Sequence, residues 1–323
     1  MLSTGIALGS VTTFVPLLLI SIITTLNPSA GDVSPFLPIE QAMLSNSVTA
    51  DQRTSLFAGY NLIGSLVGAL GALCAGLPVL VARSLDAADQ TGRQSAFVFY
   101  GLAGLLSLIL YSQLPRAPLS NTAPLRRALS PRSRKTVLTL SALFSLDSFG
   151  GGFATQAIFA LWMLGRFDVS IESLGALFFG AGIISAFSSL IAVRISQRIG
   201  LVKTMVFTHI PASVLLILVA LSPHVFIAIA LFLVRAFLSQ MDVPVRTSYV
   251  MAVVQPEERA AAASITNVPR SLASALPPLA AGWMLDQTTF AWPLLICAAC
   301  KIVYDLLLLK MFTDVVPSDS AHQ

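Results

Sequence analysis

Long apolar segments dominate this sequence. Each holds roughly twenty or more mostly apolar residues, which is the length an α-helix needs to cross the hydrocarbon core of a bilayer. Only 11% of the 323 residues are charged, whereas soluble domains carry about 25% charged residues. We therefore predict an all-α integral membrane protein with about nine transmembrane helices, at residues 14–44, 55–82, 96–113, 137–164, 172–193, 204–221, 224–254, 260–283 and 291–312.

Polar residues and proline interrupt two of these spans. The first contains LNPSAGDVSPFLP at residues 26–38, and the seventh contains SQMDVP at residues 239–244. We interpret each as one broken or tilted helix, with two half-spans as the alternative. A triple glycine, Gly150–Gly152, is predicted to break the fourth span, which is where transporters expose backbone to substrate.

Basic residues predict the orientation in the membrane. The loops assigned to one face carry about twelve Lys and Arg residues, against about three on the other face. Since short cytoplasmic loops are enriched in basic residues, the C-terminus is predicted in the cytoplasm and the N-terminus outside. The predicted parts are three spans at 1–113, a basic linker at 114–136, six spans at 137–312 and a cytoplasmic tail at 313–323.

An internal repeat relates the second span to the eighth. When the chain is shifted by about 206 residues, Arg53 falls on Arg259, Asn61 on Asn267 and Gly76 on Gly282. About nine of the 24 positions between these ends are identical without a gap. Internal repeats are typical of secondary transporters, whose halves rock about a site near the middle of the membrane.

The repeat, the basic central loop and the sequence Pro-Glu-Glu-Arg at 256–259 together resemble the major facilitator superfamily. That family folds as twelve spans in two six-span bundles. The resemblance implies that 137–312 is a complete C-terminal bundle and that the first three spans match the fourth to sixth family spans, so that the first three of twelve spans are missing. We therefore expect Met1 not to be the start of a working transporter.

The resemblance implies a secondary active transporter of a small organic solute, working by alternating access, with proton-coupled efflux as one form. Two departures bear on this: Gln197 stands where a family loop motif has Asp, and the span at 55–82 has no Gly-Pro pair, which weakens a drug–proton antiporter assignment. The alternative is a truncated, transport-inactive remnant or membrane scaffold. The expected location is the cell (inner) membrane.

Enzyme signatures are missing from the sequence, which contains no H-E-x-x-H, G-x-S-x-G or Walker A motif. We predict no enzyme activity, no cofactor and no metal site. The expected partners are the lipid bilayer, a small solute and protons, with no nucleic acid. The sequence makes no prediction of oligomeric state.

Two charges are predicted at the same depth in the membrane. Arg270 lies 11 residues beyond Arg259, and Asp147 lies 12 residues beyond Lys135; at 1.5 Å per residue both are about 16–18 Å along their helices. An intramembrane charge needs a partner or a cavity. The alternatives are a structural Asp147–Arg270 pair, either direct or bridged by water across the cavity between the bundles, and a role in binding substrate or coupling protons.

Other charges lie one or two helical turns apart. Asp242 and Arg246 are predicted to pair, with Arg235 seven residues earlier on the same face. Lys301 and Asp305 are predicted to form a structural pair, and His209 and His224 are given no role. The candidate substrate or coupling residues are Asp147, Arg270, Asn267, Asn61, Gln156, Arg235, Asp242 and Arg246; the candidate gating residues are Arg53, Glu257, Glu258, Arg259 and Arg198.

Overall fold

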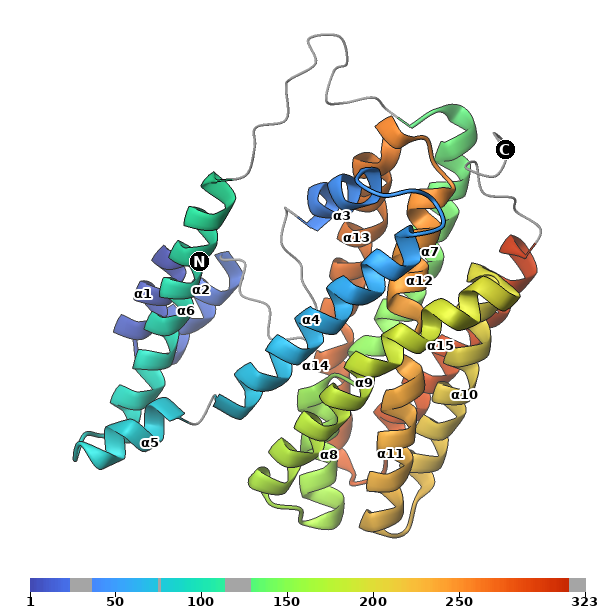
Figure 1. The fold of residues 1–323 in the computed structure, drawn as a ribbon. Helices are drawn as coiled ribbons and strands as arrows, with labels where there is room; N and C mark the ends of the chain where they lie inside the picture. The colour runs from blue at the N-terminus through green and yellow to red at the C-terminus, as the bar shows by residue number, and fades with distance from the viewer. Residues whose placement is uncertain (24–36, 75–76, 114–128, 314–323) are drawn as a thin grey trace. The chain divides into compact units, whose positions relative to one another are not determined.

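The structure is a computed structural model that describes residues 1–23, 37–74, 77–113 and 129–313. All elements in these ranges are helices (Figure 1). The chain forms two compact units, one of residues 1–34 and 71–125 and the other of residues 35–70 and 126–323. The prediction of an all-α protein is confirmed for the described residues.

Close helix packing characterises the first unit, which contains α1 (Leu2–Ser10), α2 (Phe14–Ile23), α5 (Leu77–Ser84) and α6 (Asp89–Ser112). A Cβ added to Gly5 would lie 2.5 Å from the carbonyl oxygen of Phe97 and 2.6 Å from the backbone nitrogen of Gly101. Such contact between backbones is how membrane helices associate through small residues. Gly5 and Gly101 therefore let α1 lie directly on α6.

The second unit is a helical bundle. Its helices are α3 (Leu37–Asn46), α4 (Arg53–Cys74) as far as Leu70, α7 (Pro131–Gly152), α8 (Gln156–Phe167), α9 (Ile171–Ile199), α10 (Leu201–Leu221), α11 (Val225–Ser239), α12 (Asp242–Ala252), η1 (Pro256–Glu258), α13 (Arg259–Ala275), α14 (Pro277–Gln287) and α15 (Trp292–Phe312). Helix α7 packs against α13 and α15, and α10 packs against α15, α11 and α12. Helix α3 packs against α13.

Three predicted spans of the bundle are pairs of helices. Helix α7 ends at Gly152, and α8 starts after Thr155, whose hydroxyl accepts a hydrogen bond from the backbone nitrogen of Ile158 at 3.3 Å. Helices α11 and α12 are separated at Gln240–Met241, and α13 and α14 are separated at Leu276. The predicted breaks at the triple glycine and at SQMDVP are confirmed.

Two apolar clusters form the core of the bundle. One lies around Phe144 and Met251, and the other is built on stacked Phe159 and Phe232, whose ring centroids are 4.2 Å apart. Trp162, which is 2% exposed, packs beside Phe159. Because many large apolar side chains elsewhere face outward, such as Leu279 and Phe226, the surface suits a lipid environment rather than water.

Six helical stretches among the described residues are long and apolar enough to cross a membrane: 53–71, 90–110, 133–167, 173–199, 201–221 and 225–252. The predicted spans outside these six include the one at α13, a helix of 17 residues with two arginines, and the one at α15. The first predicted span includes the segment 24–36, which lies outside the described residues. The predicted number of nine spans stays a prediction.

The predicted division at residue 113 also stays a prediction. Most of the linker at 114–136 and all but the first residue of the tail at 313–323 lie outside the described residues. Residues 35–70 share contacts with 126–323 rather than with 1–34. The repeat that pairs Asn61 with Asn267 likewise awaits a test by superposition.

Gly152, the last residue of α7, lies very close to α13 and α14. A Cβ at this position would lie 2.7 Å from the carbonyl oxygen of Ser274 and 3.0 Å from Cγ of Pro277. We expect Gly152→Ala to lower the free energy of unfolding by about 1–3 kcal/mol, because the backbone of α13 must move. The matched Gly165→Ala has open space and should be neutral or stabilising by up to about 1 kcal/mol. Chemical unfolding of the two variants in detergent tests this, and equal stabilities would contradict it.

Candidate functional site

Asp147 is the centre of a buried network of charges in the second unit. Its Oδ1 accepts a hydrogen bond from Nζ of Lys301 at 2.6 Å, and its Oδ2 accepts one from Nη1 of Arg246 at 3.1 Å. These residues come from α7, α15 and α12, and Asp147 is only 4% exposed. A buried carboxylate is tolerated when it is paired in this way.

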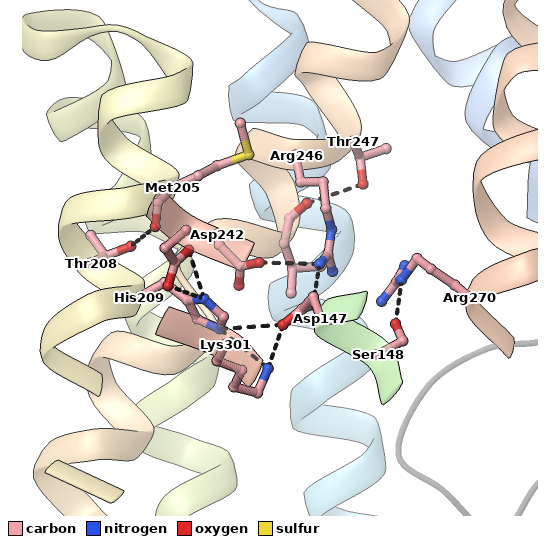
Figure 2. A network of polar contacts seen from close by, with 12 residues as sticks. Asp147, Ser148, Met205, Thr208, His209, Asp242, Arg246, Thr247, Arg270 and Lys301 are labelled. Carbon is pink, nitrogen blue, oxygen red and sulfur yellow. Dashed lines mark hydrogen bonds and ion pairs between the residues drawn. The ribbon is translucent and has the colours of Figure 1, made fainter. Parts of the chain in front are cut away.

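The network continues on both sides of Asp147 (Figure 2). Nη1 of Arg246 also lies 3.3 Å from Oδ2 of Asp242, one helical turn earlier. On the other side, Nε2 of His209 lies 3.3 Å from Nζ of Lys301, and Nδ1 of His209 lies 3.0 Å from Oδ2 of Asp305. The predicted pairing of Asp242 with Arg246 is confirmed.

The contacts of His209 indicate its tautomer. Its Nδ1 lies 3.1 and 3.0 Å from the two carboxylate oxygens of Asp305, so Nδ1 carries a proton and donates. Its Nε2 faces the ammonium group of Lys301 and therefore accepts. This assignment follows from the partners, and it makes His209 neutral in the structure.

Aromatic rings enclose the network. Cζ of Arg246 lies 5.6 Å from the ring centroid of Phe144, a cation–π contact. The ring of Tyr304 lies edge-on to His209, with centroids 5.9 Å apart. Both rings are buried, and a surrounding of low polarity strengthens the electrostatic interactions between nearby charges.

Arg270 occupies a separate position beside Asp147. The direct form of the predicted pair is not found among the described residues, since the hydrogen-bonded partners of Asp147 are Arg246 and Lys301, and Nε of Arg270 donates to Oγ of Ser148 at 2.9 Å. A contact bridged by water stays a prediction. Figure 2 shows the Arg270 side chain reaching from α13 towards Ser148. Arg270 lies at the level of Asp147 along α7, because it bonds the next residue, but the carboxylate of Asp147 is turned towards Arg246 of α12 and Lys301 of α15.

The other candidates are spread over the second unit. Nδ2 of Asn267 donates to Oε1 of Gln41 at 3.1 Å. Nδ2 of Asn61 is buried and has no hydrogen-bond partner among the described residues. Gln156 is exposed at the start of α8. Cζ of Arg235 lies 5.9 Å from the ring centroid of Phe232, so the predicted ladder with Asp242 is wrong, because the break after Ser239 separates the two.

The predicted pair of Lys301 with Asp305 is wrong. Lys301 pairs with Asp147 of α7 at 2.6 Å and Asp305 with His209 of α10 at 3.0 Å, because α15 packs against both helices. His209, to which no role was given, links these groups. The missed signal was its depth: it lies eight residues into α10, about 12 Å along the helix, and an ionisable residue inside a span is a functional candidate by default.

Arg259 joins α3 to the start of α13. Its Nε donates to the carbonyl oxygen of Met251 at 3.1 Å, and its Nη1 contacts the carbonyl oxygen of Ser45 and Oδ1 of Asn46. The guanidinium of Arg259 is buried. Three residues before Met251, Oγ of Ser248 in α12 accepts a hydrogen bond from the hydroxyl of Thr54 in α4. These contacts tie α3 and α4 to α12 and α13 at the end of the bundle where the gating residues were predicted.

The remaining gating candidates divide by exposure. Arg53 and Glu258 are buried, whereas Glu257 and Arg198 are exposed. Oε1 of Glu258 accepts a hydrogen bond from the backbone nitrogen of Ser130 at 2.6 Å, which ties η1 to the start of α7. A gating role for these residues stays a prediction.

Glu258 should make stability depend on pH. Burial opposes its ionisation, but hydrogen bonds from Ser133 and Ser130 outweigh burial and lower the pKa of its carboxyl. A lowered folded-state pKa stabilises the fold above the unfolded pKa, and this contribution is lost as pH falls through the folded value. Unfolding of Glu258→Gln measured from neutral to acid pH should show a smaller loss than the parent chain. The exposed Glu257→Gln is the control, and parallel curves for Glu258→Gln and the parent would contradict the prediction.

No group of three or more metal-ligating side chains occurs among the residues that the structure describes. The network instead consists of ion pairs and hydrogen bonds between helices.

Comparisons with known proteins identify the family of the chain. The family model of the Major Facilitator Superfamily matches residues 141–322. The chain is 26% identical to the uncharacterized membrane protein YJR124C of Saccharomyces cerevisiae, over 98% of this chain and 78% of that protein. It is 24% identical to the uncharacterized MFS-type transporter YceJ of Bacillus subtilis, over 62% of this chain and 52% of that protein.

Solved structures share the fold. The human organic anion transporter MFSD10 superposes with a TM-score of 0.69 and 18% identity, over 95% of this chain and 74% of that one. The proton:xylose symporter XylE superposes with a TM-score of 0.63 and 17% identity, over 85% of this chain and 66% of that one. With a family model that matches more than half of its residues, this multi-pass membrane chain belongs to the Major Facilitator Superfamily.

Proposed function

We propose that this chain is a secondary active transporter that moves a small organic solute by alternating access and couples that movement to protons. The observation that carries the proposal is the buried network of Asp147, Lys301, His209 and Asp305, which lies among helices that are broken within the bundle. Buried ionisable groups inside spans are costly and mark ion pathways in transporters. Membership in a superfamily of transporters supports the same function.

His209 is the proposed proton acceptor. In its neutral form Nε2 accepts from Lys301 at 3.3 Å. A proton on Nε2 removes that acceptor and places a second positive charge beside the ammonium group, while Oδ1 of Asp147 lies 3.8 Å away as a new partner. Protonation of His209 would therefore favour a different arrangement of Lys301.

Reconstitution in liposomes with a pH-sensitive dye in the lumen tests this function. We expect particular small organic solutes to cause a saturable change of lumenal pH, and we expect His209→Gln to abolish it. His224→Gln is the matched control, because His224 is exposed at the start of α11. The sign of the pH gradient that accelerates flux distinguishes proton-exchange efflux from proton co-transport.

Each other outcome has a defined meaning. Solute flux without proton movement would remove proton coupling and leave transport in place. Failure of every solute to cross would favour the transport-inactive alternative.

We also propose that the chain lies in the cell membrane with its C-terminus in the cytoplasm, because of the basic loops. A cysteine at position 90 should then react with an impermeant reagent from outside. Reaction only from inside would reverse the orientation.

A further inference from the structure

Most of the charges within the bundle of the second unit are paired. Asp147 pairs with Arg246 and Lys301, Asp242 with Arg246, and Asp305 with His209. Arg270 has no ion pair among the described residues and donates to a neutral hydroxyl instead. Because an unpaired charge inside a span is costly, an anion beside Arg270 would be favoured.

Arg270 is the cation best placed to take that anion. Arg246 and Lys301 are engaged with Asp147, whereas the hydrogen bond of Arg270 to a described residue uses only Nε, with Ser148 as acceptor. Its two terminal nitrogens have no hydrogen-bond partner among the described residues, and the side chain is only half-buried. Arg270 also experiences the like charge of Arg246, which a bound anion would offset.

The bond to Ser148 prepares the guanidinium for binding. Fixing Nε holds the plane of the group, so that its terminal nitrogens present a preset pair of donors (Figure 2). A guanidinium binds a carboxylate through two parallel hydrogen bonds. In this bond the oxygen of Ser148 is the acceptor, so its hydroxyl proton is not used. The hydroxyl of Ser148 can therefore donate a third hydrogen bond to a bound anion.

We propose that Arg270 and Ser148 form the subsite for the carboxylate of a small organic anion, and that this anion is the solute the chain transports. The proposal rests on the transport function above and adds the class of substrate to it. Asn267, three residues before Arg270 on α13, is held by Gln41 of α3 and borders the subsite along the helix. Neutral and cationic solutes of the same shape should be rejected, because they leave Arg270 unpaired.

Chemical modification of arginine tests the subsite without requiring transport. Phenylglyoxal reacts with free guanidinium groups, and mass spectrometry of peptides reports each arginine of the purified full chain. We expect modification of Arg270, with Arg246 protected by its carboxylates as the internal reference. A series of monocarboxylates from acetate to benzoate should include members that protect Arg270, whereas their amides and inorganic phosphate should not.

Variants test the same site by ligand-induced stabilisation. Arg270→Gln should weaken carboxylate binding by about tenfold or more, as expected for losing a charge-assisted pair. Arg270→Lys should restore part of the effect, since it keeps the charge without the paired donors. Arg166→Gln, which removes an exposed arginine near the end of α8, is the matched control and should bind as the parent does.

The outcomes separate this proposal from the transport function. Flux of neutral or cationic solutes with no protection of Arg270 by any carboxylate would overturn the anion subsite and leave transport standing. Protection of Arg270 without any flux would keep the subsite and count against transport. Equal protection by carboxylates and their amides, or by phosphate, would overturn the assignment of a carboxylate. Should Arg270→Gln fail to fold, Arg270→Lys and the modification of the parent chain still decide.

Discussion

Replacing Asp147 by alanine is expected to lower the free energy of unfolding by about 3–5 kcal/mol, the usual cost of removing one partner from a buried ion pair. The carboxylate has hydrogen bonds to both Lys301 and Arg246, and it is 4% exposed. Its loss leaves the Lys301 ammonium buried with only the neutral Nε2 of His209 beside it. Arg246 retains Asp242, so most of the damage should come from Lys301.

A double variant separates pairing from simple loss of packing. Asp147→Ala combined with Lys301→Met removes both charges of the 2.6 Å pair and should be more stable than Asp147→Ala alone, with a coupling of about 0.5–3 kcal/mol. The control is Asp286→Ala, an exposed carboxylate on α14, which should change stability by less than about 0.5 kcal/mol. Unfolding in mixed detergent gives the free energies. Strictly additive losses in the double variant would show that the pair is not coupled.

Replacing Arg259 by alanine is expected to cost about 2–4 kcal/mol and to release α3 from α12 and α13. Arg259 is a buried guanidinium that binds two backbone carbonyls and the side chain of Asn46. Hydrogen bonds to charged groups contribute about 1.5–3 kcal/mol each, and these ones hold together segments about 200 residues apart in the sequence. Without these hydrogen bonds, α3 is no longer linked to α12 and α13. We then expect conformations in which α3 lies farther from α13 to become more populated.

Spin labels at positions 43 and 260, which are exposed on α3 and α13, report this opening directly. The distance distribution should shift to longer values in Arg259→Ala and should be intermediate in Arg259→Lys, which keeps the charge but cannot reach several acceptors at once. Arg134→Ala, an exposed arginine in the first turn of α7, is the control. An unchanged distribution together with unchanged stability in Arg259→Ala would exclude the proposed closure.

The membrane class, the helix breaks and the family could be predicted from the sequence because each depends on local chemistry. Scarcity of charge requires lipid as the surrounding solvent. The Gly150–Gly152 run and the SQMDVP segment lie where α7 and α11 end. The Asp242–Arg246 pair was predictable for the same reason, since a spacing of four residues on one helix brings the side chains together. Depth was also predictable, because it follows from counting residues at a known rise.

Which charges pair was decided only by the tertiary structure. Asp147 and Arg270 lie at similar depths, yet Asp147 faces Arg246 and Lys301, and Arg270 faces Ser148. Depth along an axis follows from residue number, whereas the direction in which a side chain points depends on how each helix is rotated against its neighbours. That rotation is decided by packing, as where Gly150 and Gly152 bring α7 against α15 and α13. His209 acquired its role in the same way, because only the packing of α10 on α15 brings its ring to Asp305.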